Sequence, residues 1–197
     1  SKGMANISGD LIYGLPGQAL DSFRRSLEGL INAGITHLSA YSLSYEEGTL
    51  LWRRLQEGKV TPADEELTLA MYAALCEQAC LAGFEHYEIS NFALPGYRSR
   101  HNSSYWRNVP YLGLGPGAHS LDCNGTRRYV PSDIKAYLSN PGRAAVIDNE
   151  NDTDRANDRI MVSLRTIEGL DLSHFTSAQQ REIMRAAKPW LENGDLV

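Results

Sequence analysis

The segment "HNSSYW" brings four chemically versatile side chains together in a stretch that is otherwise rich in turn-forming residues. They are the imidazole of His101, the amide of Asn102, the phenol of Tyr105 and the indole of Trp106. The glycine-rich segment "YLGLGPGAHS" follows closely and permits backbone turns that most residues cannot make. This combination indicates either a binding surface or a stiff corner of a hydrophobic core.

A second chemical candidate is Asp10, which lies within the apolar stretch "DLIYGLPGQ". This pattern predicts a strand that carries a carboxylate and ends in a tight turn, with Pro16 and Gly17 at its centre. In α/β sheets, ligands bind where strands end and such loops begin. The alternative is an aspartate that accepts hydrogen bonds from the neighbouring backbone.

The cysteines do not complete a metal-binding motif. Cys76 and Cys80 have the C-x₃-C spacing of an iron–sulfur motif, but Gly83 occupies the position of the third ligand. Cys123 cannot complete the set, because such a cluster requires three or four thiolates. We therefore predict that Cys76 and Cys80 are small structural residues of a helix.

The elements that position these residues alternate between strand and helix. The segment "ISGDLIYG" predicts a strand, an apolar stripe from Asp21 to Gly34 predicts a helix, and "THLSAYSLS" predicts a second, parallel strand. A helix is expected from Thr49 to Gly58. Another is expected to begin at Thr61 and Pro62 and to end near Gly83.

After these helices we expect an extended segment to about residue 92 and then irregular chain through the histidine segment to about residue 128. A polar, turn-rich stretch predicts a domain boundary at residues 145 and 146. Apolar residues at helical spacing predict two helices beyond it, in a small module of winged-helix type. The expected domains are therefore residues 1–145 and 146–197.

Composition limits the classes of partner. The 197 residues carry a formal net charge of -5, which argues against broad binding to nucleic-acid phosphates. The sequence contains no apolar run long enough to span a bilayer, and its N-terminal residues do not resemble a signal peptide. We therefore expect a cytoplasmic protein with no transmembrane segment and no nucleic-acid partner.

Five sequence blocks, in order along the chain, resemble the radical S-adenosylmethionine proteins related to oxygen-independent coproporphyrinogen III oxidase. The blocks are "DLIYGLPGQ", "YSLSYEEGT", "YEISNFA", "HNSSYW" and "GLGPGAHS". The resemblance is closest to the haem chaperone branch of that family. It implies the C-terminal half of a partial (β/α) barrel, followed by a truncated winged-helix-like domain. The chain is thus expected to be a C-terminal fragment.

The resemblance also assigns ligands. Asp10 matches the position that contacts S-adenosylmethionine, and His101, Asn102, Tyr105 and Trp106 match an H-N-x-x-Y-W motif associated with haem binding. His101 is then a candidate axial ligand of haem iron, with Arg98, Arg100 and Arg107 available to the propionates. The alternative is that His101 has a purely structural role. The full-length parent is expected to hold a [4Fe-4S] cluster, whose ligands are absent here, so we expect the fragment to be inactive and assign it no catalytic residue.

Three functional hypotheses remain at this point. The parent protein binds haem and transfers it to acceptor proteins, or it is an enzyme that oxidatively decarboxylates coproporphyrinogen III to protoporphyrinogen IX in porphyrin biosynthesis. In the third hypothesis, the C-terminal helices bind nucleic acid or a partner protein and have no tetrapyrrole role. "HNSSYW" favours the haem chaperone.

Overall fold

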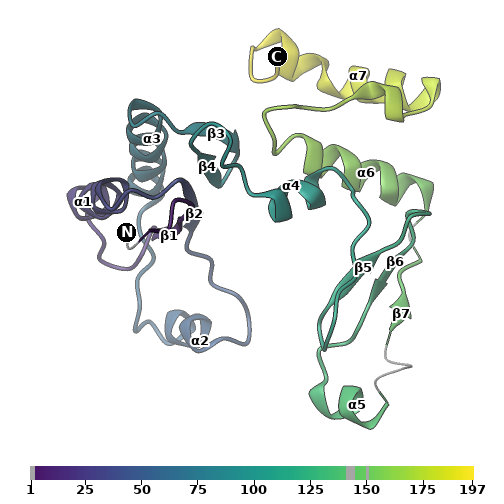
Figure 1. Ribbon diagram of the computed structural model, residues 1–197, viewed down its shortest axis with the longest axis horizontal. Coiled ribbons are helices and arrows are strands. Elements are labelled where there is room, and N and C mark those ends of the chain that lie inside the picture. The colour runs from purple at the N-terminus through teal and green to yellow at the C-terminus, as the bar shows by residue number, and fades with distance from the viewer. Residues whose placement is uncertain (1–2, 141–144, 150) are drawn as a thin grey trace. The chain divides into compact units, whose positions relative to one another are not determined.

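The computed structural model describes residues 3–140, 145–149 and 151–197. The chain forms two compact units, residues 1–103 and residues 104–197 (Figure 1). The boundary expected at residues 145 and 146 falls inside the second unit, and the neighbouring residues 141–144 and 150 lie outside the described residues. That domain division remains a prediction.

The first unit begins with the expected β–α–β segment. Strand β1 (Ser8–Tyr13) is followed by helix α1 (Leu20–Asn32) and strand β2 (His37–Ser42), and the two strands are parallel. The Pro16–Gly17 turn is confirmed, since the Gln18 N–H donates to the Leu15 carbonyl at 3.0 Å. The register pairs Asp10 of β1 with Ser39 of β2, so these two side chains are neighbours on the sheet.

Helices α2 (Leu50–Gln56) and α3 (Glu65–Leu81) follow. Thr49 caps α2 as expected, because its Oγ1 accepts a hydrogen bond from the Trp52 N–H at 3.2 Å. The expected start of the next helix at Thr61 and Pro62 is wrong: α3 begins at Glu65, with Asp64 at the N-cap. The acidic residues that favour a helix N-terminus thus lie at the true start, and Pro62 belongs to the preceding loop.

The extended segment expected to residue 92 is a hairpin rather than one strand. Strand β3 (Glu85–Glu88) turns back into β4 (Asn91–Ala93), and β4 pairs antiparallel with β2. The sheet order is therefore β1-β2-β4-β3, with β1 at one edge. The turn is anchored by Tyr72 of α3, whose hydroxyl donates to the Ile89 carbonyl at 3.2 Å.

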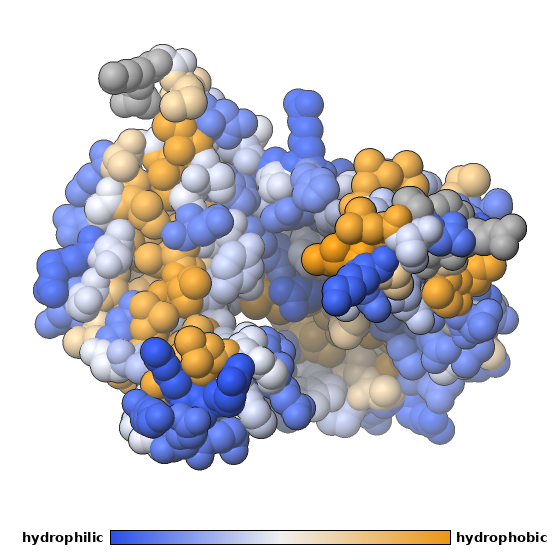
Figure 2. Space-filling model, turned by 90° about the horizontal axis from the view of Figure 1, so that it is seen from below, coloured by the Kyte–Doolittle hydropathy of each residue, from blue (hydrophilic) through white to orange (hydrophobic). Residues whose placement is uncertain are grey.

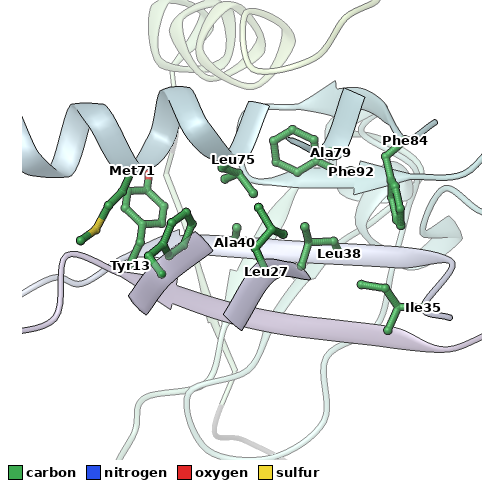
Figure 3. Packing of buried hydrophobic residues seen from close by; sticks show 11 residues of the cluster. Tyr13, Leu27, Ile35, Leu38, Ala40, Met71, Leu75, Ala79, Phe84 and Phe92 are labelled. Carbon is green, nitrogen blue, oxygen red and sulfur yellow. The ribbon is translucent and has the colours of Figure 1, made fainter. Parts of the chain in front are cut away.

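Helices α1 and α3 pack on one face of this sheet. Figure 3 shows Leu75 of α3 directed toward Ala40 and Leu38 of β2. Met71, nearer the start of α3, lies beside Tyr13 of β1 (Figure 3). Phe23 and Leu27 of α1 are fully buried in the same cluster. The opposite face of the sheet is free to carry polar side chains.

Exposed hydrophobic residues also lie on and beside the edge strand, among them Met4, Ile12 and Leu15. Figure 2 shows a band of hydrophobic residues on the part of the surface that the first unit occupies, at the left of the view. Among the described residues β1 pairs with β2 alone, and hydrophobic side chains on such an edge strand favour association with another polypeptide segment.

The histidine segment is helical, which corrects the expectation of irregular chain. Helix α4 (Arg100–Trp106) includes all four residues of the motif. Its N-terminal turn is capped by Ser99, whose Oγ accepts a hydrogen bond from the Asn102 N–H at 3.2 Å.

The second unit contains a small antiparallel sheet in the order β5-β6-β7. Its strands are β5 (His119–Leu121), β6 (Arg127–Tyr129) and β7 (Val146–Ile147). Helix α5 (Ile134–Ser139) lies between β6 and β7 in the sequence. The Asp122 Oδ1 accepts from the backbone N–H groups of Asn124 and Thr126, both at 2.9 Å, and closes the β5–β6 turn.

The two helices expected near the end of the chain are present as α6 (Asp152–Ser163) and α7 (Ser177–Glu192). A short 3₁₀ helix, η2 (Leu172–His174), lies between them. Asn151 and Thr176 begin α6 and α7 with reciprocal capping boxes. Within the described part of the chain, no helix combines the length and the apolar character needed to cross a membrane.

Candidate functional site

The face of the sheet opposite α1 and α3 carries a row of polar side chains. Alternation along β1 buries Gly9 and Tyr13 and leaves Asp10 exposed, since successive side chains of a strand point to opposite faces. The paired residue Ser39 of β2 is 5% exposed, and it lies beside Asn91 of β4 in the register. Asp10 therefore begins a polar row that crosses the sheet.

A chain of hydrogen bonds links this face to the start of α4. Ser99 donates its N–H to the Tyr87 hydroxyl at 3.3 Å, and that hydroxyl lies 2.8 Å from His37 Nε2. His37 Nδ1 lies 3.0 Å from the Ser8 hydroxyl. Burial lowers the pKa of His37, and the nearby Asp10 charge partly opposes this effect. A neutral imidazole fits the chain, with Tyr87 donating to Nε2 and Nδ1–H donating to Ser8.

A second link to α4 starts from a buried carboxylate. Glu88 is 2% exposed, and its Oε2 accepts from the Ser90 N–H at 3.0 Å and from Asn91 Nδ2 at 2.5 Å. The Asn91 Oδ1 in turn accepts from Asn102 Nδ2 at 3.4 Å. These bonds satisfy part of the demand that a buried carboxylate makes for donors.

Helix α4 places the four residues of the motif on one side of the helix. At 3.6 residues per turn, His101 and Tyr105 lie one above the other, and Asn102 and Trp106 form the adjacent row. His101 and Tyr105 are exposed, whereas Asn102 and Trp106 are half-buried. The helix thus divides the motif into an exposed pair and an anchoring pair.

The aromatic residues of the motif have defined packing within the second unit. The Arg165 guanidinium lies 5.3 Å from the centre of the Trp106 ring, a cation–π contact. The Tyr105 ring meets that of Tyr111 edge-on, with ring centres 4.7 Å apart. Trp106 therefore holds the end of α4 by packing, while Tyr105 keeps an exposed surface.

The arginines expected to reach propionates differ in environment. Arg98 Nε forms an ion pair with Glu85 Oε2 at 2.9 Å, and its guanidinium lies 5.3 Å from the centre of the Tyr87 ring. Arg100 and Arg107 are exposed. Of the three arginines, these two therefore present an exposed charge, Arg100 at the start of α4 and Arg107 just after its end.

The cysteines do not form a cluster site. Cys76 is half-buried on α3, and Cys80 and Cys123 are exposed. Among residues 3–140, 145–149 and 151–197, no group of three or more His, Cys, Asp or Glu side chains is arranged to hold a metal ion. The described residues do not fit a [4Fe-4S] cluster, whereas the exposed Asp10 carboxylate fits a contact with the hydroxyl or amine groups of a nucleoside ligand.

The residues that tie α4 to the sheet were not expected from the sequence. His37, Tyr87, Glu88 and Asn91 are polar or partly polar residues within strands, and each is nearly fully buried. An available signal was that His37 and Ser39 alternate with Leu38 and Ala40, which indicates a polar face opposite an apolar one.

Comparison with known proteins identifies the relatives of this chain. No protein-family model matches it. The chain is 35% identical over 183 residues to the haem chaperone HemW of Synechocystis, and 40% identical over 119 residues to HemW of Mycobacterium tuberculosis. These alignments cover 90% and 60% of the chain. This chain is a homologue of the HemW haem chaperones.

The mitochondrial radical S-adenosyl methionine domain-containing protein 1 of Bos taurus is also similar, at 44% identity over 125 residues. The chain spans 44% of the Synechocystis HemW and 30% of the mycobacterial one, which fits the expected fragment.

Among solved structures, the coproporphyrinogen III oxidase HemN of Escherichia coli, a radical SAM enzyme, matches 95% of the chain and 46% of its own. The TM-score is 0.66 at 18% sequence identity. HemN and this chain therefore share a mixed α/β fold, and the resemblance expected from the sequence is confirmed.

Proposed function

We propose that this chain is part of a radical SAM haem chaperone, which binds haem through α4 and transfers it to acceptor proteins. The homology to HemW supports the protein class. The observation that carries the haem site is the exposed pair His101 and Tyr105 on one side of α4, next to the anchored pair Asn102 and Trp106. An exposed imidazole is suited to ligate iron, and an adjacent phenol ring offers a flat surface for a porphyrin.

Haem titration of the full-length protein tests this function. His101→Ala should weaken haem binding by at least about tenfold and change the Soret spectrum, because the axial ligand to iron is lost. His174→Ala is the matched control, since His174 is an exposed histidine of η2 and should leave affinity and spectrum unchanged. If His101→Ala binds haem with the affinity and spectrum of the wild type, His101 is not the ligand.

Asp10 is the proposed contact to S-adenosylmethionine. Its carboxylate is exposed on the polar face of the sheet, where an ionised acceptor suits hydroxyl and amine donors. In a radical SAM protein this cofactor, bound at the iron–sulfur cluster, supplies a 5′-deoxyadenosyl radical. Asp10→Asn should weaken S-adenosylmethionine binding measured by calorimetry; Asp21→Asn, at the start of α1, is the control.

The same proposal extends to the fold, the cellular location and the partners of the protein. We assign the first unit to the C-terminal half of a radical SAM partial barrel and the last helices to a winged-helix-like domain, with a cytoplasmic location and no role in nucleic-acid binding. A shift of duplex DNA by the protein at physiological salt would contradict the last point.

The alternative function is that of an oxygen-independent coproporphyrinogen III oxidase. It is favoured by the structural match to HemN. Anaerobic incubation of the full-length parent with coproporphyrinogen III, S-adenosylmethionine and a reductant separates the two functions, because protoporphyrinogen IX forms only if that protein is the oxidase.

A further inference from the structure

The link from Glu88 to Asn102 has a fixed hydrogen-bond direction. The Ser90 N–H can only donate, so the atom of residue 88 that it contacts must be an acceptor. The same oxygen, Glu88 Oε2, is the partner of Asn91, so Asn91 must present its Nδ2 amide there. Its carbonyl Oδ1 is thereby directed to Asn102.

This direction determines which side chains are suitable at position 102. Because Asn91 Oδ1 only accepts hydrogen bonds, residue 102 has to donate one, and the Asn102 Nδ2 amide does so. A carboxylate at position 102 would place one of its oxygens, which can only accept, against the accepting Oδ1 of Asn91. Rotating the Asn91 amide would not relieve this, because its oxygen would then face Glu88 Oε2.

His101 lies between two residues that are tied to the sheet. Ser99 is held through its backbone N–H by the Tyr87 hydroxyl, and Asn102 is held through its side chain by Asn91. The Ser99 Oγ also accepts from the Asn102 N–H, which closes the first turn of α4. The backbone around His101 is thus fixed on both sides while its side chain is exposed.

We propose that Asn102 is a positioning residue: it fixes the first turn of α4 to the sheet through Asn91 and Glu88, and so sets the direction of the His101 imidazole. The inference rests on the proposed function, in which His101 ligates haem iron. Asn102 then contributes to haem binding without touching haem. A residue outside the motif, Asn91, must contribute equally.

The test is a double-mutant cycle of Asn102→Ala and Asn91→Ala, read by haem affinity and by the electron paramagnetic resonance spectrum of the ferric complex. Each single variant should weaken haem binding by about fivefold, the effect of one lost hydrogen bond. The double variant should be no weaker than either single variant, because both remove the same link. The ferric signal should broaden or shift in each, since it reports the orientation of the axial imidazole.

One control variant accompanies the cycle. Ser103→Ala, one residue further along α4, should keep the affinity and spectrum of the wild type. Asn102→Asp replaces Asn91→Ala if the latter does not fold, and should weaken haem binding at least as much as Asn102→Ala.

The outcomes separate the inference from the function on which it rests. If Asn102→Ala weakens haem binding while folded Asn91→Ala does not, Asn102 contacts haem directly and the inference is overturned. Amide hydrogen exchange of residues 100–103 in the haem-free protein tests the Asn102–Asn91 hydrogen bond independently of haem. Asn102→Ala should raise the exchange rate about fivefold. Unchanged exchange overturns the link, whereas a wild type that binds no haem overturns the proposed function.

Discussion

The two units differ in how their structures are held. In the first unit, α1 and α3 bury a continuous core against the sheet, and Phe23, Leu27 and Phe92 are fully excluded from solvent. Of the hydrophobic side chains buried in the described part of the chain, only Leu121 and Phe175 belong to the second unit. There, an apolar groove of about 750 Å³ lies between α6 and α7. Packing specifies the first unit, whereas caps and turns account for much of the second.

The largest expected effect comes from truncating the core of the first unit. Leu27→Ala should lower the free energy of unfolding by about 2–5 kcal/mol, because it removes a fully buried side chain and leaves a cavity. Ile183→Ala, on the wall of the α6–α7 groove, should cost less than about 1 kcal/mol, since solvent already reaches that wall. Urea unfolding followed by circular dichroism measures both. Equal losses would show that the groove is packed as tightly as the core.

A smaller effect is expected from the polar chain that crosses the sheet. Tyr87→Phe keeps the ring but removes the hydroxyl that joins His37 to the Ser99 N–H. We expect a loss of about 1–3 kcal/mol in the free energy of unfolding, because the buried His37 nitrogen and the Ser99 N–H lose a partner. Tyr97→Phe is the control, an exposed tyrosine of the same unit that should have little effect. A stability equal to that of the wild type would show that water replaces the hydroxyl.

The sequence predicted the elements whose residues follow one local pattern. The stripe from Phe23 to Ile31 and the short apolar run of β1 were sufficient for the first β–α–β segment, because each element follows one local pattern. The hairpin of β3 and β4 was missed because its turn, Ile89 and Ser90, contains no glycine or proline. Helix α4 was missed because its composition is that of a turn, and it is held by tertiary contacts from Asn91 and Arg165.

The same limit applies to the candidate site. The motif residues and Asp10 could be selected from the sequence because their types suggest chemistry. The partition of α4 into an exposed and an anchored row could not, because it depends on tertiary contacts with Asn91 and Arg165. Glu88 illustrates the point, since nothing local distinguishes a buried carboxylate in a hairpin from an exposed one.

The pH dependence of stability tests whether His37 is buried and neutral in the folded protein. Burial lowers the pKa of folded His37 below its ordinary value of 6.5, so between these two values the unfolded chain binds a proton that the folded chain does not. His37 therefore makes no pH-dependent contribution well above pH 6.5. Its contribution to stability falls as the pH decreases through 6.5, and the fall stops below the folded pKa.

His37→Gln removes this titration while it keeps a donor and an acceptor. The difference in unfolding free energy between the wild type and this variant should therefore change between pH 7.5 and pH 5, with the wild type losing more stability. A difference independent of pH would contradict a buried, neutral His37.

The smallest effects compare one turn from each unit. Gly17 and Gly125 adopt φ of 72° and 79°, and a β-carbon on either would meet open space. Alanine should therefore cost about 1 kcal/mol at each position, from backbone strain alone. Gly29→Ala, within α1, is the control for added side-chain bulk and should raise stability by about 0.5–1 kcal/mol.

Because the local strain is the same at Gly17 and Gly125, a difference between the two measured losses of stability reports how strongly each turn is coupled to global unfolding. We expect the full loss for Gly17→Ala in urea unfolding. A smaller loss is expected for Gly125→Ala, whose turn can open without disturbing a large core. Equal losses would show that the second unit unfolds as cooperatively as the first.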